Sequence, residues 1–103
     1  MRAGSLVIAV ILLAACGATA WPKTAGETTC TEWTSQMTAD QRSALGAAML
    51  LALRANDGGT VRPRDDVMKA FTTAIGDVCK ATPDAKVSAV SATIYGYSKG
   101  LKP

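Results

Sequence analysis

The sequence predicts a small all-α domain of four helices that carries a single disulfide. Apolar residues recur at helical spacing, most clearly at Val67, Phe71 and Ala74. No segment shows the alternation of apolar and polar residues that is typical of strands. Of the three cysteines, Cys30 and Cys79 remain as an even pair once the N-terminal segment is assigned to export.

The first residues have the profile of a secretory signal. Arg2 precedes an apolar run over residues 6–15, which is shorter than the roughly 20 residues that cross a bilayer. Leu-Ala-Ala before Cys16 matches a bacterial lipoprotein cleavage box, so we predict a signal peptide over residues 1–15 and lipidation of Cys16. An ordinary signal-peptidase site, Ala-Thr-Ala at residues 18–20, is the competing interpretation. The first interpretation predicts an exported protein, anchored to a membrane and facing the periplasm or the cell exterior.

A disulfide between Cys30 and Cys79 is expected in an oxidising compartment. A domain of this size has a limited core, and closing a loop of about fifty residues restricts the unfolded chain by roughly 4 kcal/mol. Two buried free thiols are the alternative. We therefore expect a helical, disulfide-stapled domain over residues 30–103.

Residues 16–29 are expected to form the lipidated N-terminus and a tether. They are small and polar and are broken by Pro22 and Gly26. Trp21 would lie at the headgroup level of the membrane, or it would fold back on the domain.

Two helices are predicted in the first half of the domain. Cys30, Trp33 and Met37 fall on one face of a short helix. Thr38 and Gln41 form a capping box that opens a helix over residues 39–55. Its main apolar stripe consists of Leu45, Met49, Ala52 and Leu53. Leu50 and Leu51 lie off that stripe, and this excess of apolar residues predicts a binding surface.

Two more helices are predicted in the second half. Residues 56–59, Asn-Asp-Gly-Gly, end the preceding helix, and Pro63 is expected as the first residue of the next. The buried positions of that helix are predicted at Val67, Phe71, Ala74, Ile75 and Val78. The last helix is expected to start at Pro83, with Thr82 as its N-cap and Asp84 as an early acid. It is expected to extend to about Ser98, with Val87, Val90, Ile94 and Tyr97 inward. Residues 99–103 are expected to be a frayed tail.

The composition argues against an enzyme. The chain has no His, which removes the usual general base and the commonest metal ligand. Asp65 and Asp66 are adjacent on a helix, where they suit its N-terminal dipole better than acid–base chemistry. The net charge is only +3, with interspersed signs and no basic run. We therefore expect no catalytic site, no metal, no cofactor and no nucleic-acid partner.

A family resemblance rests on the run Thr-Cys-Thr-Glu-Trp at residues 29–33, Met-Thr at 37–38, Gly-Gly-Thr-Val at 58–61 and Val-Cys-Lys at 78–80. Over residues 29–95 the chain resembles the HdeA/HdeB acid-stress chaperones, which are small exported helical proteins with one disulfide. The resemblance implies a domain that loosens in acid and holds unfolding clients, with a possible homodimer at neutral pH. It makes five residues candidates for the binding surface: Trp33, Met49, Leu50, Leu51 and Leu53. The lipid anchor at Cys16 departs from the soluble members of that family.

These observations predict a membrane-tethered, extracytoplasmic protein-binding module. The family resemblance implies that this module is a holdase-type chaperone for unfolding envelope proteins. The alternative is a host- or phage-encoded lipoprotein that binds a specific envelope partner, for example to exclude a second phage.

Overall fold

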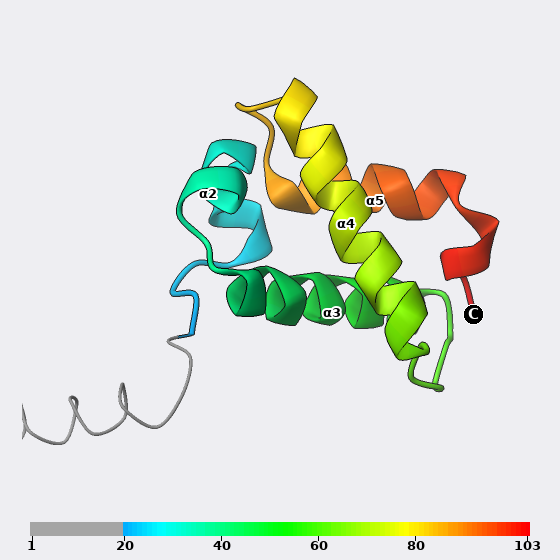
Figure 1. Cartoon of the computed structure of the whole chain (residues 1–103). Coiled ribbons are helices and arrows are strands. Elements are labelled where there is room, and N and C mark those ends of the chain that lie inside the picture. Colours follow the sequence, from blue (N-terminus) through cyan, green and yellow to red (C-terminus); the bar gives the residue numbers. More distant parts are fainter. Residues whose placement is uncertain (1–19) are drawn as a thin grey trace, which may run out of the picture.

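Four helices share one core in the computed structural model, which describes residues 20–103. They are α2 (Cys30–Ser35), α3 (Ala39–Asn56), α4 (Asp65–Ala81) and α5 (Val87–Tyr97), with short 3-10 turns η1 (Ala25–Glu27) and η2 (Lys99–Leu101). Figure 1 shows α2 and α5 above α3, while α4 crosses in front of it. Within the described part, strand-like pairing is limited to one antiparallel bridge between Thr29 and Lys86. The predicted all-α, four-helix, single-disulfide domain is confirmed.

The two ends of α3 follow the predicted signals. The Thr38 backbone N–H donates to Gln41 Oε1 at 2.8 Å, and the Gln41 N–H donates to Thr38 Oγ1 at 3.1 Å. These bonds satisfy two donors that the first turn of a helix leaves free. At the other end Gly58 has a φ of +83°, and the Gly59 N–H donates to the Arg54 carbonyl at 2.8 Å. A residue without Cβ takes this left-handed conformation at little cost.

The starts of the last two helices differ from the prediction. Helix α4 begins at Asp65, two residues after Pro63, and its first turn carries the expected Asp65 and Asp66. Helix α5 begins at Val87, four residues after the expected start at Pro83. The backbone before Val87 pairs with α2 and is not helical. The Thr31 N–H donates to the Pro83 carbonyl, and the Cys30 N–H donates to the Ala85 carbonyl. This long-range pairing overrides the local helix-start signal.

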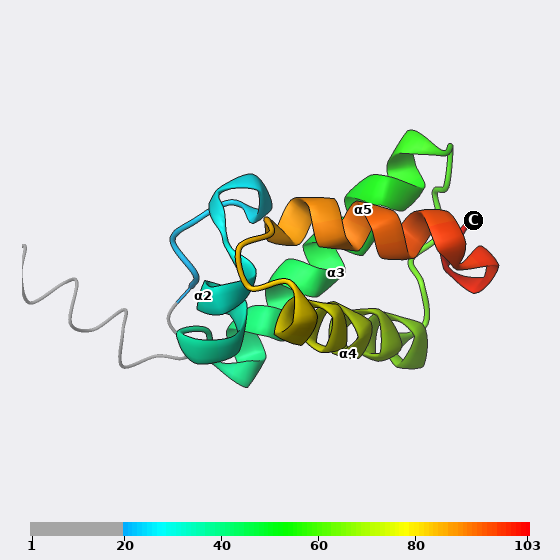
Figure 2. The ribbon, with the colours of Figure 1, turned by 90° about the horizontal axis from the view of Figure 1, so that it is seen from above.

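Helices α4 and α5 run side by side with α3 beneath them (Figure 2). The buried apolar residues between the elements are Cys30, Trp33, Met37, Met49, Leu50, Met68, Phe71, Ile75, Cys79, Val87, Val90, Tyr95 and Leu101. Gly46 is buried where α3 meets α4, and a Cβ there would lie 2.3 Å from Thr72 Oγ1. The close approach of these two helices therefore depends on a residue without a side chain.

The buried faces of α4 and α5 are rotated slightly from the predicted ones. Phe71 and Ile75 are buried as expected, but Met68 is buried and Val78 is 38% exposed. On α5 the predicted inward residue Tyr97 is 88% exposed, and Tyr95 is buried in its place. Each helix packs against more than one neighbour, so its buried face is set by their combined positions.

The C-terminal residues dock on the turn after α3 and do not form the expected frayed tail. Arg54 Nη1 donates to the Leu101 carbonyl at 2.9 Å, and Leu101 is buried. Tyr95 Oη donates to Asp57 Oδ2 at 2.6 Å. Burial, together with this bond to the Asp57 carboxylate, raises the pKa of the Tyr95 phenol, so it stays a neutral donor.

Candidate functional site

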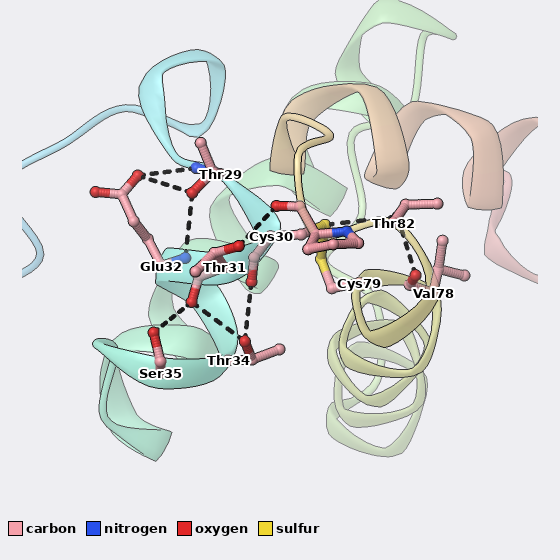
Figure 3. The surroundings of a disulfide bond; sticks show 10 residues. Thr29, Cys30, Thr31, Glu32, Thr34, Ser35, Val78, Cys79 and Thr82 are labelled. Carbon is pink, nitrogen blue, oxygen red and sulfur yellow. Dashed lines mark hydrogen bonds between the residues drawn. A yellow bond between two sulfur atoms is a disulfide. The ribbon is translucent and has the colours of Figure 1, made fainter.

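The Cys30–Cys79 disulfide joins the first residue of α2 to the last turn of α4. The two Cα atoms are 4.8 Å apart, and both cysteines are buried. Figure 3 shows the bridge beside Thr82, whose Oγ1 donates to the Val78 carbonyl at 3.0 Å. The predicted pairing, with both cysteines on the core side, is confirmed. The bridge fixes the short helix α2 against α4.

Helix α2 begins in a capping box that the sequence reasoning missed. The Thr29 N–H donates to Glu32 Oε1 at 2.9 Å, and the Glu32 N–H donates to Thr29 Oγ1 at 3.2 Å (Figure 3). Lys23 forms an ion pair with the same carboxylate. The hydrogen bond from Lys23, followed by that from the Thr29 backbone, lowers the pKa of Glu32. The Thr-x-x-Glu spacing was the available signal.

Residues 21–29 pack on the domain, and we call them the N-terminal strap. Trp21 Nε1 donates to Thr28 Oγ1 at 2.8 Å, and Thr28 is fully buried. The Val87 N–H donates to the Thr28 carbonyl at 2.8 Å, which fixes the strap to the start of α5. The expected tether over residues 16–29 is therefore wrong from Trp21 onward. Of the two positions considered for Trp21, the structure shows it folded back on the domain.

A second carboxylate holds the strap at η1. Glu27 Oε1 accepts from the Thr24 backbone N–H at 3.2 Å and from Thr24 Oγ1 at 3.0 Å. These bonds, the backbone one first, lower the pKa of Glu27. Glu27 and Glu32 thus both favour the folded strap in their ionised form.

The five predicted binding residues do not form a common surface. Trp33, Met49 and Leu50 are buried, with Leu50 fully inaccessible and Trp33 1% exposed. Leu53 is partly buried against the core. Leu51 alone among the five is exposed, at 37%. The prediction of a surface is therefore wrong for the folded domain, because the buried face of α3 is centred on Gly46, Met49 and Leu50, of which the predicted stripe contained only Met49.

An open apolar groove of about 300 Å³ runs between α4 and α5. Its lining includes Val67, Phe71, Ile94 and Leu101, all from these two helices and the C-terminal turn. The folded domain can therefore receive an apolar side chain here without opening its core. This groove could not be predicted from the sequence, because the C-terminal tail that closes one end of it was expected to be frayed.

A second groove, of about 410 Å³, lies where the described chain begins. Ala20 and Trp21 form one wall, and Asp40, Gln41, Ala44, Leu45 and Ala48 of α3 complete it. The start of the strap therefore lies beside the N-terminal half of α3.

The predicted lipidation residue Cys16 and the predicted signal peptide, residues 1–15, lie outside the described residues. Among the helices of residues 20–103, none has the length and hydropathy needed to span a bilayer. The same part of the chain contains no cluster of three His, Cys, Asp or Glu that could bind a metal ion.

No family model matches the chain, and no curated protein or solved structure matches it either. The resemblance to the HdeA/HdeB proteins stays a prediction from the sequence.

Proposed function

We propose that the chain is an extracytoplasmic protein-binding module, tethered to a membrane through Cys16. The observation that carries the proposal is the Cys30–Cys79 bridge in a chain whose first residues have the pattern of an export signal. Structural disulfides persist in oxidising compartments, so the bridge supports a location outside the cytoplasm. Intact mass of the purified protein tests the tether. A mature chain that starts at Cys16 with acyl chains supports it, and cleavage after Ala20 contradicts it.

The groove between α4 and α5 supports binding of a protein by the folded domain. It is apolar and open, and its accessible lining includes Val67, Ala70 and Ile94, which suits the insertion of an apolar side chain. Ala70→Glu would place a carboxylate on the groove wall, at a position that is already exposed. Ala89→Glu, on the exposed side of α5, is the matched control.

The holdase version of this function requires the domain to open. Three of the five residues assigned to client binding, Trp33, Met49 and Leu50, are buried, so clients would reach them only after the helices separate. Protonation of Glu27 and Glu32 would weaken the strap in acid, because both carboxylates are stabilised in their charged form. The disulfide would still hold α2 to α4 in the loosened state.

Aggregation of an acid-unfolded client with and without the protein tests the holdase version. If the protein suppresses client aggregation at low pH and the Ala70→Glu variant suppresses it equally well, clients bind to the opened core and not to the groove. An absence of suppression would reject chaperone activity.

The alternative is recognition of one specific envelope partner by the folded domain, for which the preformed groove is the favourable observation. A phage-exclusion role is one form of it. Cells that express the wild type should then plate phage poorly, Ala70→Glu should restore plating, and Ala89→Glu should not. Unchanged plating with the wild type would reject this form of the function.

A further inference from the structure

The outer face of α3, formed by Ala44, Ala48, Leu51, Ala52 and Ala55, is exposed and carries no charge. Apart from Asp40 in its first turn, every exposed residue of this helix is uncharged. The exposed positions of a surface helix are ordinarily charged or polar. This side of the molecule therefore has the composition of a surface that is buried in a contact.

The two arginines of α3 are both directed away from this face. Arg42 Nη1 donates to the carbonyls of Trp33 and Met37. Arg54 Nη1 donates to the Leu101 carbonyl at 2.9 Å. The absence of charge on the outer face thus results from where these side chains bond as well as from the sequence.

The described chain begins beside this face. Ala20 and Trp21 line a groove together with Ala44, Leu45 and Ala48, and the polar end of this groove is formed by Asp40 and Gln41. Cys16 precedes Ala20 by four residues, which span at most about 14 Å when fully extended. If Cys16 carries the lipid anchor, the acylated residue lies within that distance of Ala20, which borders the N-terminal half of α3.

We propose that the outer face of α3, with Trp21 beside it, lies against the lipid bilayer to which the chain is tethered. This inference rests on the proposed anchor at Cys16. The face is mostly alanine and lacks the cluster of large aromatic and Arg residues that dominates protein–protein binding energies. Weak apolar contact is sufficient for a bilayer, because the anchor already keeps the face at a high effective concentration next to the lipid.

This orientation leaves the other candidate surface accessible. The groove between α4 and α5 is lined by those helices and the C-terminal turn, and α3 lies on the other side of both (Figure 2). With α3 against the bilayer, the groove would point away from it. One domain would then contact lipid on one side and a protein partner on the other.

Site-specific labelling of the lipidated full-length protein tests the proposal. Cys30 and Cys79 are bridged and Cys16 would be acylated, so an introduced cysteine is the free thiol. Ala48→Cys and Leu51→Cys report on the outer face, and Ala92→Cys on the exposed side of α5 is the matched control. Each variant is labelled with an environment-sensitive fluorophore and reconstituted in phosphatidylcholine vesicles, after circular dichroism has shown native helix content.

We expect a blue shift of the emission and quenching by spin-labelled lipid at positions 48 and 51, and neither effect at position 92. Adding Ala52→Glu to Ala48→Cys should abolish the blue shift while the anchor keeps the protein on the vesicles. Labels at 48 and 51 that stay as hydrated as the label at 92 would overturn the proposal. A blue shift that persists in detergent together with cross-linked dimers would overturn it in favour of a second copy of the chain.

Intact mass of the same sample separates this inference from the proposed function. Acyl chains on Cys16 with a hydrated outer face would reject the bilayer contact alone. A sample without acyl chains would reject the tether and the bilayer contact together.

Discussion

Helices α3 and α4 have 18 and 17 residues and pack directly on each other, yet they differ in how they divide apolar and charged residues. The exposed side of α4 carries five charged residues: Asp65, Asp66, Lys69, Asp77 and Lys80. The exposed residues of α3 include one charge, Asp40 in its first turn, and its outer face from Ala44 to Ala55 carries none. Helix α4 is therefore a strongly amphipathic helix with one apolar face, whereas α3 is apolar on both sides beyond its first turn. Only one side of α3 is used by the core.

One of the two largest effects should come from removing the covalent link at the end of α4. Replacing both cysteines, Cys30→Ser and Cys79→Ser, should lower the free energy of unfolding by about 2–5 kcal/mol, because the unfolded chain loses its restriction. Urea denaturation of the two proteins measures the difference. An unchanged midpoint would show that the packing of α4 is sufficient without the bridge.

Truncation of one large side chain on each helix tests the comparison itself. Phe71→Ala on the buried face of α4 should cost about 3–5 kcal/mol, since it leaves a cavity in the core. Leu51→Ala on the outer face of α3 should cost less than about 1 kcal/mol, because Leu51 is already partly in water. Equal losses, measured by thermal and urea unfolding, would mean that both sides of α3 are structural.

The contact between the two helices should be sensitive to volume at one residue of α3. Gly46→Leu should destabilise the domain by about 1–3 kcal/mol, because any side chain there meets Thr72. Ala48→Leu, on the outer face of the same helix, is the control and should be nearly neutral. If the two variants unfold alike, the close approach of α3 to α4 is not required.

The smallest effect concerns the strap. The pKa of Glu32 is lowered in the folded protein, so its contribution to stability is present above the unfolded pKa and is lost as pH falls through the folded one. The difference in unfolding free energy between wild type and Glu32→Gln should therefore be largest near neutral pH and vanish in acid. A difference that does not depend on pH would assign the effect to hydrogen-bond geometry instead of charge.

The contrast between α3 and α4 also explains what could be predicted from the sequence. Helix existence, the Thr38 cap, the Gly58 stop and the disulfide all follow from local signals or cysteine count. Most of the buried face of α4 was predictable because charge marks its other side. On α3 both sides are apolar, so the sequence did not distinguish the core side, and Leu50 was placed on the surface although it is buried.

The remaining differences arise from contacts between residues far apart in the chain. The strap was predicted as a tether because its residues are small and polar, but Thr28 pairs with Val87 across the fold. The C-terminal tail was predicted to fray, but Arg54 binds the Leu101 carbonyl. Neither contact produces a periodic pattern in the sequence. The strap borders one groove and the C-terminal turn borders the other, so neither groove could be predicted.

The position of the disulfide has a mechanical consequence. Cys30 directly follows the strap, and Cys79 lies close to the end of α4. Under tension between the two ends of the chain, the load would pass from the strap through the sulfur bridge into residues 80–103. The segment between the cysteines, which contains α3 and nearly all of α2 and α4, lies outside that path. Stretching would detach the strap and α5 while the enclosed loop stays covalently closed.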